Sequence, residues 1–300
     1  MEFLFQYKKK SGQQVKYFLK EQDISKGLLA KIKFQGGDIV VNGKRENVLY
    51  ELVENDHVCV VIPDEKEHET LLVDDTPIDI VYEDDHLLVV NKPAKVASIP
   101  AQYHPNHTMA NRVKGYYKRQ NYKNQIVHVV TRLDRDTSGL MLFAKHGYAH
   151  AKLDKQLREK TLIKTYQALL SGEMANLKEH DRITLPIARD LPSILKRKVA
   201  EDGKFADTEY WVDEKTASLA LVHIRLHTGR THQIRVHFSA IGFPLVGDDL
   251  YGGQMDLPLK RQALHCCELS FIHPFTNEHL KFQQSLPKDM EVIQKIFAKR

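Results

Sequence analysis

A short polar stretch holds the residues best suited to chemistry. Residues 131–140 read TRLDRDTSGL and lie between two apolar runs, VHVV at 127–130 and LMLFAK at 140–145. The aspartates Asp134 and Asp136 could bind a cation, share acid and base roles, or supply one carboxylate to a reaction. A plain hairpin loop is the alternative, because Asp, Thr, Ser and Gly are ordinary turn residues.

Neither calcium nor zinc fits the sequence. An EF-hand loop that began at Asp134 would need a glutamate at its twelfth position, where Lys145 stands. His227, His232 and His237 are five residues apart, and five residues turn a helix by roughly 500°, so the three do not share a face. HExxH and CxxC spacings, a Walker loop and GxGxxG are all missing. We therefore predict chemistry without a metal or a cofactor.

The composition suits a globular protein. With 42% hydrophobic residues, the chain of 300 residues can build one large domain or a domain with a smaller module. No apolar run reaches the roughly 18 residues of a membrane span, and the N-terminus lacks the order of a signal peptide. Three cysteines, Cys59, Cys266 and Cys267, are too few for a disulfide framework. We expect a cytoplasmic protein with reduced thiols.

Charge is unevenly distributed along the chain. The net charge is +5 over residues 1–35, −9 over residues 36–79 and +9 over residues 80–300. Two basic regions that flank an acidic one suit a polyanionic partner, most commonly a nucleic acid. An ordinary solvated surface is the alternative.

Residues 1–62 predict a small α/β module. Val15, Phe18 and Leu19 have helical spacing, and Ser25 can cap a second helix. Asn42-Gly43 is a hairpin signal, and the run HVCVVIP is typical of a closing strand. This order, and the stretch GDIVVNGK above all, resembles the RNA-binding module of the ribosomal protein S-four type.

That resemblance implies contacts between lysines and RNA. The lysines that fall on the two expected helices are Lys16, Lys20, Lys26, Lys31 and Lys33. The family usually has Ser-Arg where this chain has Ser25-Lys26, and lysine lacks the bidentate fork of arginine. The alternative is a generic module whose lysines face water.

A second, larger domain follows a linker. Residues 63–77 are charged and bounded by prolines, which predicts an acidic linker. Residues 78–300 carry more strand patterns than helix patterns, with helices expected at 108–119, 148–160 and 231–242. The fold class predicted is α+β, with a mixed, largely antiparallel sheet in a catalytic domain after the small α/β module.

The polar loop also resembles a known active-site motif. RLDRDTSGLMLFAK is similar to the loop of the RluA/RluD-type pseudouridine synthases, although Thr131 stands where the family usually has histidine. Further segments match the family in its own order, from about residue 78 to 290. They are KPA at 92–94, KTYQALLSG, DGKFADTEYWV, LHTGRTHQIRVHFSAIGFPLVGDDLYG and RQALHC. The resemblance implies the pseudouridine synthase fold for nearly the whole second domain.

The resemblance also implies roles for three residues. Asp134 would carry the isomerisation of a uridine, either by attacking C1′ or by assisting formation of a glycal. Arg235 would keep that carboxylate ionised and aimed, as a neighbouring cation does. Tyr166 would stack on the uracil or help to remove its C5 proton. Taken singly, Tyr166 is equally typical of a half-buried strand and Arg235 of a helix surface.

Basic side chains near these motifs are candidates for holding RNA. They are Lys92, Arg132, Arg135, Arg230 and the run Lys196-Arg197-Lys198. YYKRQNYK at 116–123 interleaves aromatic and basic residues, as base-stacking surfaces do, although the end of an amphipathic helix has the same composition. The expected substrate is ribosomal or transfer RNA. The protein is expected to be a monomer.

Two other functions are compatible with parts of the sequence. A catalytically inactive RNA-binding or ribosome-associated protein would keep the module and the basic surface without needing an ionised Asp134. A nucleoside or glycoside hydrolase would use Asp134 and Asp136 as its two carboxylates, provided that both face the same sugar.

Overall fold

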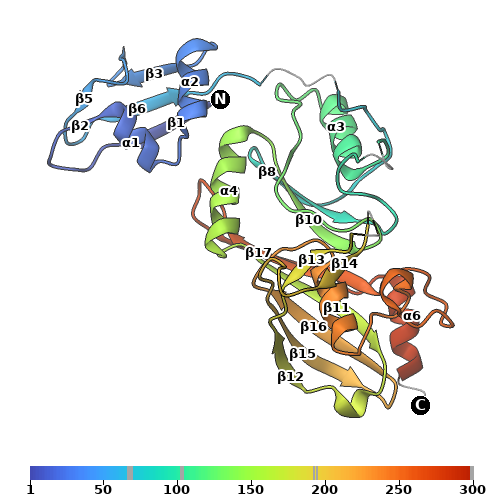
Figure 1. Cartoon of the computed structure of the whole chain (residues 1–300). Helices are drawn as coiled ribbons and strands as arrows, with labels where there is room; N and C mark the ends of the chain where they lie inside the picture. The colour runs from blue at the N-terminus through green and yellow to red at the C-terminus, as the bar shows by residue number, and fades with distance from the viewer. Residues whose placement is uncertain (66–69, 102–104, 192, 194, 298–300) are drawn as a thin grey trace.

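The computed structural model describes residues 1–297 apart from 66–69, 102–104, 192 and 194. Figure 1 shows a small N-terminal sheet at one end of the molecule and a much larger sheet beyond it, with α4 (Gly147–Glu159) facing the small sheet. Among the described residues, no helix is long and apolar enough to cross a membrane.

The N-terminal part is a four-stranded antiparallel sheet with two helices. The sheet order is β1-β6-β3-β4, and a short β2–β5 pair lies beside it. Its strands are β1 (Glu2–Gln6), β2 (Gln13–Gln14), β3 (Asp38–Val41), β4 (Lys44–Arg45), β5 (Glu51–Leu52) and β6 (His57–Val61). Its helices are α1 (Val15–Glu21) and α2 (Lys26–Phe34).

Local signals account for this part. Val15, Phe18 and Leu19 are buried, as their helical spacing predicts. The Ser25 side chain caps α2 by accepting a hydrogen bond from the Leu28 amide at 3.1 Å. Asn42 and Gly43 join β3 to β4 with φ values of 49° and 79°, and two positive φ values are what a tight hairpin turn requires.

The larger part is built on one ten-stranded sheet. The order is β12-β15-β16-β11-β17-β10-β8-β7, with β18 beside β17 and β9 beside β10. All of its pairs are antiparallel except β10–β17. The predicted α+β class with a mixed, largely antiparallel sheet is therefore confirmed.

The elements of this part follow in chain order. The strands are β7 (Asp79–Glu83), β8 (Leu87–Lys92), β9 (His128–Val129), β10 (Ser138–Ala144), β11 (Ile163–Ser171), β12 (His180–Ile183), β13 (Ile187–Arg189), β14 (Arg197–Val199), β15 (Thr208–Lys215), β16 (Leu219–Leu226), β17 (Leu264–Ile272) and β18 (His279–Gln283). Besides α4, the helices are α3 (Met109–Arg119), α5 (Gln233–Ala240), α6 (Lys288–Phe297) and the 3-10 turns η1 (Met174–Asn176) and η2 (Asp249–Tyr251).

Two expected elements are shorter than the sequence predicts. The strand expected at 127–130 pairs only at His128 and Val129. The helix expected at 231–242 begins at Gln233, because His232 before it has a φ of 57° and so cannot continue a right-handed helix. This bend keeps His232 in a turn beside the helix.

The two parts contact each other through α4. The Tyr148 hydroxyl donates to the Gln22 carbonyl at 2.6 Å, and the Phe3 ring lies edge-on to Tyr148 with centroids 4.9 Å apart. Lys152 and Lys155 also form ion pairs with Asp23. The boundaries at 62 and 77 remain predictions, but the described ends of the linker are packed: Glu65, for example, accepts from His128 at 2.6 Å.

One backbone position should be intolerant of any side chain. Gly139 has a φ of 111°, and a Cβ there would lie 2.2 Å from the Cys266 carbonyl oxygen. We expect Gly139→Ala to destabilise the protein by roughly 3 kcal/mol, measured as a lower midpoint of guanidinium unfolding. Gly229→Ala is the control, since no heavy atom lies within 4 Å of the place that its methyl group would take. Equal midpoints for both variants would contradict the expectation.

Candidate active site

The polar loop lies between β9 and β10 and opens onto the main cavity. This cavity has a volume of about 760 Å³, and residues from the segment 97–99, α4, β11, β16 and the turn before α5 also line it. The Asp134 side chain lines it and is 29% exposed, so its carboxylate is reachable from solvent. The loop is also a turn, because the Thr137 amide donates to the Asp134 carbonyl at 3.1 Å.

Lys92 holds this turn from the interior of the protein, and its ammonium does not reach the surface. Its side chain is fully buried, and its ammonium donates to the carbonyls of Pro93, Val96 and Arg135 at 2.7 to 2.9 Å. Burial lowers the pKa of Lys92 to about 7. All three donors of the ammonium are used, so the prediction that Lys92 contacts RNA is wrong.

Two further side chains hold the loop backbone. Arg261 donates to the Asp136 carbonyl at 3.1 Å, while its fork grips Asp289 at 2.7 and 2.8 Å. The Ser98 hydroxyl donates to the Leu133 carbonyl at 2.6 Å and accepts from the Leu133 amide at 2.9 Å. The position of Asp134 is therefore set by main-chain contacts on both sides of it.

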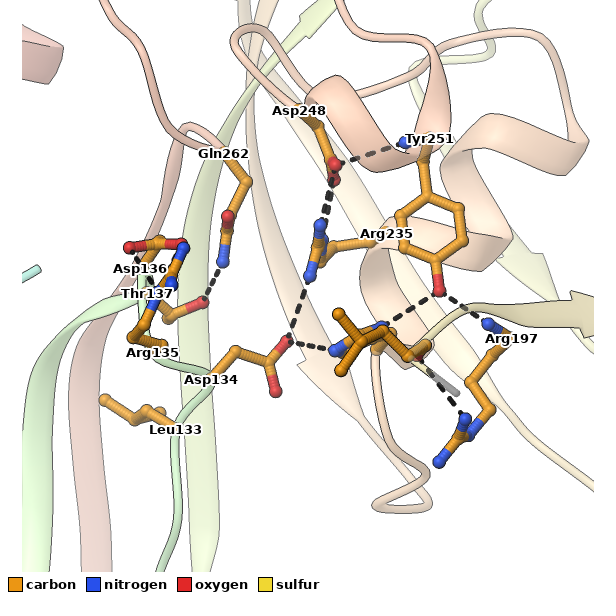
Figure 2. Close-up of polar contacts among 12 residues, drawn as sticks. Leu133, Asp134, Arg135, Asp136, Thr137, Arg197, Arg235, Asp248, Tyr251 and Gln262 are labelled. Carbon is orange, nitrogen blue, oxygen red and sulfur yellow. Dashed lines mark hydrogen bonds and ion pairs between the residues drawn. The ribbon is translucent and has the colours of Figure 1, made fainter. Parts of the chain in front are cut away.

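Arg235 lies between two carboxylates. Its Nε and Nη2 each donate to Asp248 at 2.7 Å, and its Nη1 lies 3.8 Å from Asp134 Oδ2. Figure 2 shows this chain of contacts from Asp248 through Arg235 to Asp134. Asp248 is fully buried, so the bidentate pair fixes the plane of the guanidinium. Asp248 was not predicted, although it stands in the quoted GDDLYG segment.

Tyr251 and His232 complete the far wall. The guanidinium of Arg235 lies 4.9 Å from the centre of the Tyr251 ring. The Tyr251 hydroxyl accepts from the Arg197 amide at 2.8 Å and lies 2.9 Å from His232 Nδ1. His232 Nε2 is 3.9 Å from Asp134 Oδ2, and burial lowers the pKa of His232. The αL turn at His232 brings this ring into the site, a position that a regular helix would not give it.

Tyr166 lines the cavity from β11. It is 4% exposed, and burial raises the pKa of its phenol well above the ordinary value. The phenol is therefore protonated throughout the physiological range, which suits packing against a base better than removal of a proton.

The other predicted RNA contacts fall into separate groups. Arg132 and Arg230 are exposed and line the cavity. Arg135 lines it too, but its guanidinium forms an ion pair with Asp136 at 2.8 Å. The lysines of the N-terminal helices lie in the other part of the molecule, Lys16 partly buried and Lys20, Lys26 and Lys33 exposed.

Two sequence features have structural roles instead. In YYKRQNYK, Tyr117 is fully buried, and the hydroxyls of Tyr116 and Tyr122 donate to Glu83, so these rings do not form a base-stacking surface. Thr131 accepts a hydrogen bond from the Leu142 amide at 2.9 Å and is buried, which ties the start of the loop to β10.

The charges around the cavity are strongly asymmetric. Among the described residues that line it, Asp134 is the one carboxylate, and the cationic residues are Arg132, Arg135, Arg158, Lys160, Lys164, Arg225, Arg230 and Arg235. Asp136 does not line the cavity, which leaves a two-carboxylate hydrolase without its second acid. In the described part of the chain, no group of three or more His, Cys, Asp or Glu residues could hold a metal ion.

Comparisons with known proteins identify the class of enzyme. The profile of the RNA pseudouridylate synthase family matches residues 86–240. A Bacillus subtilis (strain 168) protein named "Uncharacterized RNA pseudouridine synthase YjbO" is 45% identical over 92% of this chain and 96% of its own length. The chain therefore belongs to the RNA pseudouridine synthases, which are isomerases.

Other relatives refine the family. The "Ribosomal large subunit pseudouridine synthase D" of Pseudomonas aeruginosa is 38% identical over 73% of this chain and 71% of its own length. The chain is thus a member of the RluA/RluD family. The solved structure of "Human RNA Pseudouridylate Synthase Domain Containing 4" has a TM-score of 0.58, covering 71% of this chain and 90% of its own at 22% identity, and shows the shared fold. None of these matches confirms the S-four-like module.

Asp248 should be essential to the shape of the site. Asp248→Asn leaves the buried Arg235 without its bidentate partner, and breaking a buried ion pair costs roughly 3 kcal/mol or more. We expect a clearly lower unfolding midpoint in guanidinium. Asp249→Asn removes the same charge at an exposed neighbour and serves as the control. If both variants unfold together with the wild type, the pair does not hold Arg235.

Proposed function

We propose that this enzyme isomerises a specific uridine in structured RNA, with Asp134 as the reacting carboxylate. One observation carries the proposal: Asp134 is the one carboxylate among the described residues of a basic cavity, and Arg235 lies beside it. Large-subunit ribosomal RNA is the first candidate substrate, because it appears in the names of relatives at 38% identity. Transfer RNA is the second candidate.

The reaction needs no outside atoms, so one well-placed carboxylate is sufficient. The N1–C1′ bond of uridine breaks, the uracil turns, and a bond forms between C5 and C1′. The C5 proton is lost and N1 gains a proton. Asp134 would act by attacking C1′ or by assisting formation of a glycal, and either route requires an ionised carboxylate.

The target base must leave its stack to reach Asp134. Flipping costs a few kcal/mol, less in loops than in a duplex. Exposed Arg132 and Arg230 at the cavity are suited to holding the phosphates around it. Tyr166 would then pack against the uracil, and Arg235, aimed by Asp248, would orient Asp134.

An inactive RNA-binding protein is the alternative, and the geometry argues against it. A binding surface would not need Asp134, Tyr166 and Arg235 to meet at one cavity from three distant segments. It would also not need a buried carboxylate such as Asp248 to aim the arginine.

Residues 1–62 would act as an RNA-binding module joined to the catalytic domain at 78–300 by the linker 63–77. Support comes from the +5 charge of residues 1–35 and from the exposed lysines of α1 and α2. The module would add affinity or target choice, since Asp134, Tyr166 and Arg235 all lie elsewhere. We retain the expectation of a monomer.

The contact between the module and α4 would fix the position of these lysines relative to the cavity. It combines aromatic packing of Phe3 and Tyr148 with ion pairs at Asp23. Mixed apolar and charged contacts of this kind can set an orientation between two parts of a chain. That orientation would determine which RNA helices reach the lysines of α1 and α2 while a uridine occupies the cavity.

Asp134 and Asp136 should behave very differently on substitution. Asp134→Asn keeps the shape of the side chain and removes its charge, so pseudouridine formation should fall by on the order of 10⁴-fold or more, with RNA binding changed only a few fold. Asp136→Asn is the matched control, because the Asp136 side chain does not line the cavity and instead pairs with Arg135. Single-turnover assays on RNA from cells that lack the gene would measure both. A dead Asp136→Asn beside a normal Asp134→Asn would refute the proposal.

The module lysines should influence binding rather than chemistry. The triple variant Lys20→Ala, Lys26→Ala and Lys33→Ala should bind RNA more weakly, with a slope of log K against log salt reduced by roughly 2. Its rate at saturating RNA should stay within about twofold of wild type. A second triple variant, Lys178→Ala, Lys260→Ala and Lys281→Ala, removes the same charge from exposed sites and is the control. Identical affinity and salt slope in the two variants would remove the binding role.

A further inference from the structure

Lys164 is a cavity residue to which neither the sequence nor the proposed reaction has given a role. It lies on β11, two residues before Tyr166. Alternate residues of a strand face the same side of the sheet, and both side chains line the cavity. The Lys164 ammonium lies 6.0 Å from the centre of the Tyr166 ring.

Lys164 is partly buried, and its ammonium differs from the charged groups of the buried cations Lys92 and Arg235 in having no fixed partner among the described residues. Over the part of the chain that the structure describes, Lys164 makes no hydrogen bond and no ion pair. Lys92, by contrast, is saturated by three carbonyls, and Arg235 is gripped by Asp248. All three ammonium donors of Lys164 are thus available to a ligand.

A cation without a protein partner in the wall of the cavity lowers the stability of the folded protein. Burial lowers the pKa of Lys164, although the neighbouring Cys266 and Asp134 act in the opposite direction. Lys164 is partly buried, so its ammonium loses part of its hydration without gaining a partner among the described residues, and this disfavours the charged form in the folded state. Such a conflict between local chemistry and folding is expected at sites that serve function.

We propose that Lys164 binds a carbonyl oxygen of the flipped uracil and stabilises the negative charge that the base carries while it is detached. This step rests on the proposed function. When the N1–C1′ bond breaks, its electron pair stays with the uracil and spreads over N1, O2 and O4. A charged donor beside these oxygens interacts more strongly with the anion than with the neutral base, and so accelerates the cleavage.

The position of Lys164 favours the base over a phosphate. A base that packs against Tyr166 lies directly below the Lys164 ammonium, since both side chains project from one face of β11. Arg132 and Arg230, by contrast, are exposed and therefore better placed for phosphates that stay in solvent. Asp134 attracts the Lys164 ammonium from a distance but forms no ion pair with it, so the donors of the ammonium stay available to a base.

The test compares Lys164→Met, which removes the charge at similar length, with Lys164→Arg, which keeps it. RNA carrying tritium at uridine C5 releases its label as the product forms, so single-turnover release at saturating enzyme reports the reaction. Lys164→Met should react about 10- to 100-fold more slowly with RNA affinity within about threefold, as expected for loss of a charged hydrogen bond. Lys164→Arg should retain much of the rate.

Two further measurements separate a chemical role from a structural one. Because the ammonium is present below its pKa and is lost as pH rises through it, the wild-type rate should decline at alkaline pH. Since the pKa of Lys164 is lowered, that decline should begin below the range of an ordinary lysine, and Lys164→Arg should lack it. Lys164→Met should unfold at the same or a higher temperature, because it removes a poorly solvated charge.

Lys145→Met is the matched control. Lys145 is also a partly buried lysine near a tyrosine ring, 4.1 Å from the centre of Tyr122, but it lies outside the cavity and away from the contact with the N-terminal module. Its single-turnover rate should equal the wild-type rate.

Three results would overturn the inference. A normal rate for Lys164→Met would exclude the role outright. Weaker binding with a shallower salt slope and a normal rate at saturation would assign Lys164 to a phosphate. A slow Lys164→Met that also unfolds at a lower temperature, with an alkaline decline that persists in Lys164→Arg, would make the residue structural. If Asp134→Asn is inactive in the same assay while Lys164→Met is normal, the proposed function stands and only this inference fails.

Discussion

The shared guanidinium of Arg235 is the interaction on which the arrangement of the site depends. A single cation serves two carboxylates, but unequally: Asp248 receives two short hydrogen bonds, and Asp134 lies 3.8 Å away. The buried pair fixes the guanidinium, while the looser contact leaves the Asp134 carboxylate accessible from the cavity. An arginine bound equally tightly to Asp134 would hold that group away from a substrate. The unequal sharing therefore orients the Asp134 carboxylate without engaging it in a tight ion pair.

The loop that carries Asp134 is held chiefly through its backbone. Its carbonyls are bonded by Lys92, Arg261 and Ser98, which come from β8, from the segment before β17 and from the region between β8 and α3. Because the backbone is fixed in this way, Arg132 can stay exposed and Arg135 can pair with Asp136 without moving Asp134. Gly139 fixes the end of the loop to the sheet. It has no Cβ, so its backbone can lie against Cys266, and β10 can pair in parallel with β17. The loop that carries Asp134 is thus positioned by the rigid ten-stranded sheet.

The sequence by itself determined the local features. Helical spacing placed Val15, Phe18 and Leu19 in a core, Ser25 and Asn42-Gly43 marked a helix start and a turn, and the loop motif pointed to the family. These features depend on neighbouring residues or on a contiguous motif, so a single sequence records them. The assignments at Asp134, Tyr166 and Arg235 came from the resemblance, and the structure brings these residues to one cavity.

Tertiary structure alone decided what charged and aromatic residues do. Nothing near Lys92 in the sequence indicates that its ammonium points inward onto three carbonyls, and nothing near Arg235 identifies Asp248 as its partner. Tyr117 could equally have faced RNA, and Lys164 could have been a surface lysine of a strand. Each outcome depends on burial and on contacts between segments far apart in the chain. A charged side chain changes its role when it is buried and gains a fixed partner. Neighbouring residues in the sequence do not indicate burial or a partner from a distant segment.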